Sequence, residues 1–169
     1  MSVSILVVGL GNPLAADDGA GVAVVEELAR RGLPAHARVE ILGSDSLRLP
    51  TLWRGEPRVW LVDALVTGAA PGSVHRLEHE SVMALHQRHA SAHALSLPEN
   101  LRWIALSEPR MTAVRYTLWG IEPLSLGCGR LSDEVAFAVG PAAAQILTAL
   151  GATDPGHLTK SARHEPATT

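Results

Sequence analysis

The stretch that decides the fold is residues 9–21, which read GLGNPLAADDGAG. It follows a short apolar run at 3–8 that is typical of a buried parallel strand. Residues 19–31 then carry apolar side chains at a helical spacing, and Gly32 ends the predicted helix. A strand, a loop and a helix in this order predict the first unit of an α/β fold.

The glycines of this loop do not complete a dinucleotide-binding fingerprint. That pattern needs a third glycine at position 14, where the chain has Leu14. It also needs a helix that begins at once, whereas about seven residues intervene here. Pro13 lacks the backbone N–H that a phosphate would need. A nucleotide-binding domain is therefore disfavoured.

The remaining periodicity predicts one α/β domain over residues 1–150. Further strands are expected at 38–42, 59–62 and 115–121, with an edge strand at 73–77; helices are expected at 81–89, at 98–106 and from Ser132. Strands that alternate with helices predict a twisted, mainly parallel sheet of about five strands with helices on both faces. Residues 151–169 are polar and aperiodic, so they are expected to form a flexible tail.

Composition excludes several classes of protein. Fourteen basic against seventeen acidic residues give a net charge of −3, without the basic patch that nucleic acid requires. No apolar run approaches the length of a membrane span, and no signal peptide is visible, so neither a nucleic acid nor a membrane is expected as a partner. The single cysteine fits a reducing compartment, and a cytoplasmic monomer is expected.

Three acidic residues follow predicted strands. Asp17 and Asp18 lie at the mouth of the first helix, and Asp63 ends the apolar run at 59–62. The carboxyl edge of a doubly wound sheet carries the ligand site, and neighbouring strands lie only ~5 Å apart. Asp18 and Asp63 are therefore expected to converge, and two close carboxylates need a proton or a cation between them. Asp17 is expected to cap or brace the helix beginning near Gly19.

Eight histidines offer candidates for a third ligand. His36, His75 and His79 have loop or edge contexts and are most simply solvated, and the pair His86 and His89 fits an exposed helix face. His93 lies in an irregular stretch between small residues, where functional side chains are often held. The pattern alone leaves His93 as one candidate among three.

The loop at 9–21 resembles the N-terminal signature of the hydrogenase maturation proteases. The similarity continues in the expected order over residues 3–150, through Val62-Asp63-Ala64, Ala70-Pro71-Gly72, Ser91-x-His93-x-Leu95 and Gly120-Ile121-Glu122-Pro123. One departure is the stretch at 43–46, Gly-Ser-Asp-Ser, where the family commonly has an Asp-Gly-Gly-Thr-like loop.

The resemblance implies an endopeptidase that removes the C-terminal extension of a nickel-iron hydrogenase large-subunit precursor after nickel insertion. It implies Asp18, Asp63 and His93 as metal ligands, with Asp18 and Asp63 also catalytic, and Gly11, Asn12 and Asp17 binding substrate or shaping the loop. Nickel would arrive with the precursor, and zinc or cadmium would be able to occupy the isolated site. The alternative is a non-catalytic chaperone that binds the nickel-loaded precursor.

Overall fold

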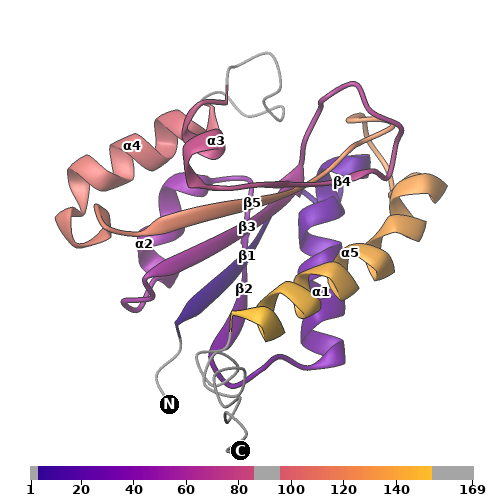
Figure 1. The fold of residues 1–169 in the computed structure, drawn as a ribbon. Helices are drawn as coiled ribbons and strands as arrows, with labels where there is room; N and C mark the ends of the chain where they lie inside the picture. Colours follow the sequence, from indigo (N-terminus) through magenta and orange to yellow (C-terminus); the bar gives the residue numbers. More distant parts are fainter. Residues whose placement is uncertain (1–3, 86–95, 154–169) are drawn as a thin grey trace, which may run out of the picture.

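The computed structural model describes residues 4–85 and 96–153. Within them the chain forms a five-stranded sheet with the order β2-β1-β3-β5-β4 (Figure 1). The strands are β1 (Ile5–Leu10), β2 (Ala37–Gly43), β3 (Arg58–Ala64), β4 (Val74–Leu77) and β5 (Arg115–Ile121). All pairings are parallel except that of the edge strand β4 with β5, which is antiparallel. The predicted α/β architecture is confirmed.

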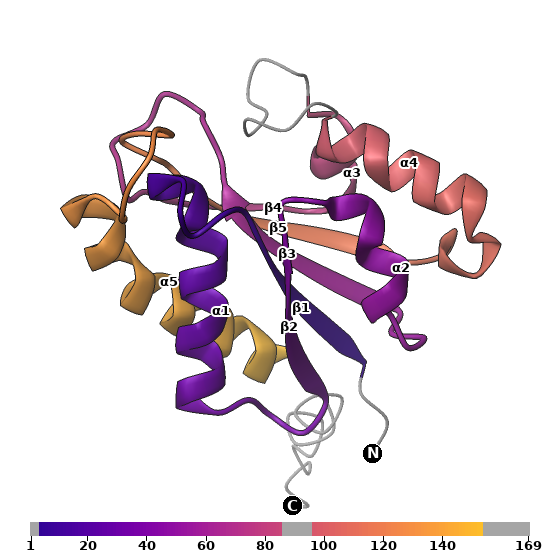
Figure 2. The same cartoon turned by 180° about the vertical axis from the view of Figure 1, so that it is seen from behind.

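Helices cover both faces of the sheet (Figures 1 and 2). One face packs against α1 (Ala20–Arg31) and α5 (Asp133–Ala152), and the other packs against α2 (Leu49–Leu52), α3 (His79–Met83) and α4 (Leu97–Ser107). Short 3-10 helices connect these elements: η1 (Ala16–Gly19), η2 (Ser46–Arg48) and η4 (Pro109–Met111). Alternate residues of β1 face opposite cores, with Ile5 and Val7 towards α1 and α5 and Leu6 and Val8 towards the other layer.

Some element boundaries differ from the sequence-based expectation. β1 continues to Leu10, because Gly9 pairs with both β2 and β3 and Leu10 pairs with Gly43 of β2. α3 begins at His79, two residues before the predicted start at residue 81, and ends at Met83, while residues 86–89 of the predicted helix lie outside the described residues. α5 runs unbroken through Pro141 to Ala152 and takes in the first two residues of the predicted tail. By length and composition alone, α5 is long and apolar enough to cross a membrane, which was not expected from the sequence. The core helix of a soluble protein passes the same test, so this is weak evidence for a membrane span.

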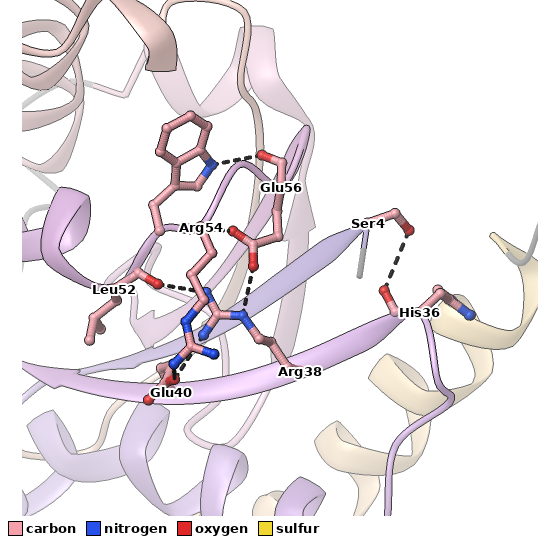
Figure 3. A network of polar contacts seen from close by, with 8 residues as sticks. Ser4, His36, Arg38, Glu40, Leu52, Arg54 and Glu56 are labelled. Carbon is pink, nitrogen blue, oxygen red and sulfur yellow. Dashed lines mark hydrogen bonds and ion pairs between the residues drawn. The ribbon is translucent and has the colours of Figure 1, made fainter. Parts of the chain in front are cut away.

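A polar network joins the amino ends of β2 and β3 (Figure 3). Arg38 on β2 donates to the buried Glu56 carboxylate at 2.6 Å, to Glu40 at 2.8 Å and to the Leu52 carbonyl at 2.5 Å. The indole N–H of Trp53 donates to the Glu56 carbonyl at 2.8 Å. The network thereby fixes the connection that leads from β2 into β3.

Two of the histidines expected to be solvated are instead packed. His36 is buried, with its Nε2 lying 3.2 Å from the Leu150 carbonyl oxygen near the end of α5. The His79 ring stacks on Tyr116, and its Nδ1 accepts from the Tyr116 N–H at 3.1 Å. Both contacts join segments far apart in the chain, which local context did not indicate.

Candidate active site

The loop that leads from β1 into η1 is shaped by Gly11 and Asn12. Gly11 has a φ of +104°, and a Cβ there would lie 1.7 Å from the Asp18 carbonyl oxygen, so only glycine fits. The Asn12 N–H donates to Asp18 Oδ2 at 2.8 Å, and Asn12 Oδ1 accepts from the Leu14 N–H at 3.0 Å. These contacts shape the loop and hold the Asp18 carboxylate through the Asn12 N–H.

Asp63 lies near the carboxyl end of β3, one strand away from the loop that carries Asp18. Its Oδ1 accepts from the Ala64 N–H at 2.8 Å. Gly21, at the start of α1, packs so closely on β3 that a Cβ would lie 2.1 Å from the Val62 carbonyl oxygen. This close approach of helix to strand places η1, and hence Asp18, at the same edge of the sheet as Asp63.

Asp18 and Asp63 interact electrostatically. Both residues are buried. Burial, and to a lesser extent the charge of Asp18, raise the pKa of Asp63 to about 8, although the hydrogen bond from the Ala64 N–H acts in the opposite direction. Two close, buried carboxyl groups repel each other when both are ionised, so this arrangement favours a proton or a cation between them.

Asp17 faces away from this pair and is fully buried, at 0% exposure. Its Oδ2 accepts from the N–H groups of Leu124 and Ser125 at 2.9 and 3.0 Å and from the Ser132 hydroxyl at 2.9 Å; its Oδ1 accepts from the Ser132 N–H at 2.7 Å. Burial raises the pKa of Asp17, but these hydrogen bonds outweigh it, so the pKa lies below its ordinary value.

Asp17 was expected to cap or brace the helix beginning near Gly19, and the capping alternative is wrong. α1 has no side-chain cap, whereas Ser132, which Asp17 holds, is the N-cap residue of α5. Asp17 is loop-shaping because it ties η1 to the segment that joins β5 to α5.

Glu122 supports the site, a role that the sequence analysis did not assign to it. It follows β5 and is buried. Its carboxylate accepts from the Thr67 hydroxyl at 2.6 Å, the Thr67 N–H at 2.8 Å and the Gly68 N–H at 3.0 Å. Burial raises the pKa of Glu122, but these bonds outweigh it and lower the pKa. Glu122 thus holds the segment that leaves β3 just after Asp63. The sequence feature that could have identified Glu122 is its position directly after an apolar strand, which is also the position of Asp63 in the sequence pattern.

The third predicted ligand, His93, lies outside the described residues, as do His86 and His89. In the described part of the chain, no three His, Cys, Asp or Glu side chains form a metal-binding group. The divergent loop at 43–46 does border the site, because the Gly11 N–H donates to the Gly43 carbonyl at 3.0 Å. Asp45 in that loop caps η2 by accepting from the Leu47 N–H at 3.1 Å.

The fold and the paired carboxylates define a small α/β protein with a candidate metal or acid–base site at the carboxyl edge of its sheet. A family model described as hydrogenase maturation protease matches residues 22–149. The chain therefore belongs to the hydrogenase maturation protease family and is a peptidase of hydrogenase maturation.

Individual proteins are similar to this chain over most of their length. The chain is 32% identical to the hydrogenase 2 maturation protease of Escherichia coli K12, covering 95% of this chain and 99% of that protein. It is 34% identical to protein FrxA of Pyrococcus furiosus, covering 78% and 94% respectively. Among solved structures, the maturating endopeptidase HybD of E. coli superposes with a TM-score of 0.75 at 32% identity, covering 89% of this chain and 93% of that one. HybD of Thermococcus kodakarensis superposes with a TM-score of 0.74 at 29% identity, covering 86% and 98%.

Proposed function

We propose that this peptidase removes the C-terminal extension of a nickel-iron hydrogenase large-subunit precursor once nickel has been inserted, using Asp18, Asp63 and His93. The observation that carries the proposal is the pair Asp18 and Asp63, buried together at the carboxyl edge of the sheet. Membership of the family supplies the reaction, in which water adds across one peptide bond and releases a shortened large subunit and a short peptide. Nickel belongs to the substrate in this scheme.

The donor set suits that cargo. Two carboxylates and one imidazole form a mixed oxygen and nitrogen set that is compatible with nickel or zinc. Three protein ligands leave positions open for groups of the precursor. Because burial and like charge disfavour two ionised carboxylates, a cation that arrives with the correct precursor would relieve this repulsion. The same donor set would also accept zinc or cadmium in the isolated protein.

Two chemical roles remain for the carboxylates. In one, the site polarises the scissile carbonyl and activates water through the bound ion. In the other, the ion reports only that nickel is present, and Asp18 or Asp63 accepts a proton from the attacking water. In either role Asn12 keeps Asp18 oriented through its N–H bond, and Ala64 does the same for Asp63.

Cleavage of a purified, nickel-loaded precursor tests the proposal, with the new C-terminus read by mass spectrometry. We expect one cut with the wild type, and none with nickel-free precursor. Asp18→Asn and Asp63→Asn should remain folded and lose nearly all activity. A wild-type protein that binds the precursor but leaves its mass unchanged would contradict the proposal and favour the chaperone alternative.

A further inference from the structure

Leu65, two residues after Asp63, packs on the same side of the sheet as Asp63. Asp63 alternates in phase with Val59 and Leu61 on β3, whose side chains belong to the core that packs against α2, α3 and α4. Leu65 belongs to the same core and is buried. Its N–H donates to the Ile121 carbonyl at 2.9 Å, so the contact between β3 and β5 extends past the end of β3. Leu65 is therefore a fixed neighbour of Asp63.

Gly120 on β5 provides the space that the Leu65 side chain fills. Gly120 pairs with Asp63 in the parallel register, so both positions face the same side of the sheet. A Cβ on Gly120 would lie 2.6 Å from both Cβ and Cδ2 of Leu65, which is closer than carbon atoms approach in proteins. The Leu65 side chain thus occupies the space that a side chain at position 120 would need.

This filled space separates Asp63 from an imidazole. His75 on β4 pairs with Gly120 from the other side, so Asp63, Gly120 and His75 form one row across three strands. Two strand spacings amount to about 10 Å, and an aspartate and a histidine can approach each other across such a distance when the residue between them has no side chain. Leu65 closes this route, because its side chain lies over Gly120.

His75 takes its partners from beyond Leu65. Its Nε2 lies 3.3 Å from Thr67 Oγ1 and 3.8 Å from a carboxylate oxygen of Glu122, the residue after β5. Thr67 Oγ1 in turn donates to Glu122 at 2.6 Å. His75 therefore belongs to a polar cluster of its own, and Leu65 lies in the chain between this cluster and Asp63.

The direction of the Asp63 carboxyl group depends on what packs around it. Its Oδ1 accepts from the Ala64 N–H at 2.8 Å, and a bond to the adjacent residue does not choose between the neighbouring strands β1 and β5. With Leu65 on the side of β5, the carboxyl group is directed towards β1, whose loop carries Asp18. Asp18 and Asp63 interact electrostatically, in agreement with this direction.

We infer that Leu65 is a positioning residue: seated on Gly120, it keeps the Asp63 carboxyl group turned towards Asp18 and away from His75. The inference rests on the proposed function, since it takes Asp63 to act on the nickel-loaded precursor. Leu65 acts only through Asp63, by fixing the direction in which this carboxyl group meets the ion. Residues that orient a metal ligand typically change metal affinity or activity about 10- to 100-fold when they are altered, and loss of Leu65 should have an effect of this size.

Steady-state cleavage of the nickel-loaded precursor by Leu65→Ala tests the inference, with Leu6→Ala as the matched control. Leu6 is a buried leucine of the same core, at the amino end of β1, where it pairs with Val59. Both variants lose the same atoms, and each should lose about 2–5 kcal/mol of stability. At a temperature where circular dichroism shows both folded, kcat should fall about 10- to 100-fold in Leu65→Ala with KM nearly unchanged. The kcat of Leu6→Ala should equal that of the wild type.

Two further pairs of variants separate positioning from stability. Leu65→Val and Leu6→Val make smaller cavities, so they allow the same comparison if the alanine variants do not fold. Leu65→Met nearly restores the lost volume and should recover most of kcat, whereas Leu6→Met should show no change in kcat. Equal kcat in the folded Leu65 and Leu6 variants would mean that Leu65 contributes to stability alone, and the inference would be overturned.

Binding of Cd²⁺ to the free protein gives a measurement that needs no precursor. Isothermal titration calorimetry should show an affinity about 10- to 100-fold lower in Leu65→Ala than in the wild type, with Leu6→Ala unchanged. Both readouts depend on the direction of Asp63, so they should change together. A change in kcat without a change in Cd²⁺ affinity, or the reverse, would also overturn the inference.

A failure of the proposed function itself would look different. The wild type would then leave the precursor uncut, and the Cd²⁺ titrations alone would decide the role of Leu65. Weaker binding in Leu65→Ala than in Leu6→Ala would still support Leu65 as the residue that positions Asp63. Equal binding in the two variants, or no binding by the wild type, would overturn the inference.

Discussion

Replacing Asp17 with asparagine should destabilise the protein. The Asp17 carboxylate accepts four hydrogen bonds, three at Oδ2 and one at Oδ1. An amide has only one acceptor oxygen. If that oxygen takes the place of Oδ2, the new NH₂ group faces the Ser132 N–H, and two donors meet in a buried space.

The magnitude follows from these contacts. One bond to a charged acceptor is lost, the other three lose their charge assistance, and a buried donor is left unpaired. Charge-assisted bonds contribute about 1.5–3 kcal/mol and neutral ones about 0.5–1.5 kcal/mol, so Asp17→Asn should cost about 3–5 kcal/mol. For a domain of this size that corresponds to a fall in Tm of about 10 °C. The variant should still fold at 25 °C and retain cleavage there, because Asp17 points away from Asp18 and Asp63.

Urea denaturation followed by tryptophan fluorescence measures the loss. Asp18→Asn is the control: it keeps an acceptor oxygen for the Asn12 N–H and removes a charge that acts on Asp63, so its free energy of unfolding should equal or exceed that of the wild type. A free energy of unfolding for Asp17→Asn within about 0.5 kcal/mol of the wild type would refute the argument. So would complete inactivity of folded Asp17→Asn, since that would place Asp17 in the chemistry.

Three further predictions concern the pH dependence of stability at Glu56, the effect of a chelator on Tm, and the role of His93. Burial raises the pKa of Glu56, but the hydrogen bonds and charge of Arg38 together with backbone N–H bonds, including that of Arg54, outweigh burial and lower the pKa. Glu56→Gln should therefore cost about 1–3 kcal/mol at pH 7, and urea titrations should show this difference shrinking below pH 4.5, the ordinary pKa of the side chain. A constant difference down to pH 3 would contradict this assignment. Adding a chelator to the free enzyme should leave its Tm unchanged, because a site with open positions is not structural; a large drop by calorimetry would show otherwise. A histidine must be neutral to bind metal, so cleavage by the wild type should fall below neutral pH. His93→Gln should lose most of the cleavage activity, and its remaining activity should no longer fall below neutral pH. His86→Gln and His89→Gln should match the wild type across the pH range.

Several features of this protein follow from local sequence. The apolar run of β1, the loop at 9–21 and the helical spacing after it are local patterns, and they predicted the first strand, loop and helix. Asp18 and Asp63 were placed at one edge because parallel strands end at a common edge and each residue follows such a strand. Gly11 belongs to the same loop pattern, and its positive φ explains why the loop contains glycine there.

Other features depend on contacts between distant segments. Asp17 binds Leu124, Ser125 and Ser132, which lie 107 to 115 residues further along the chain, and Glu122 binds Thr67 across 55 residues. Periodicity describes only which face of an element is apolar, so it does not specify where a polar side chain in a connecting loop will point.

The sequence by itself therefore determined the α/β architecture and the two carboxylates of the candidate site. Only the tertiary structure decided that Asp17 turns away from that site and that Glu122 holds the segment after Asp63. The physical reason is that a buried carboxylate must find hydrogen-bond donors, and in this protein those donors come from loops that meet only when the sheet has formed.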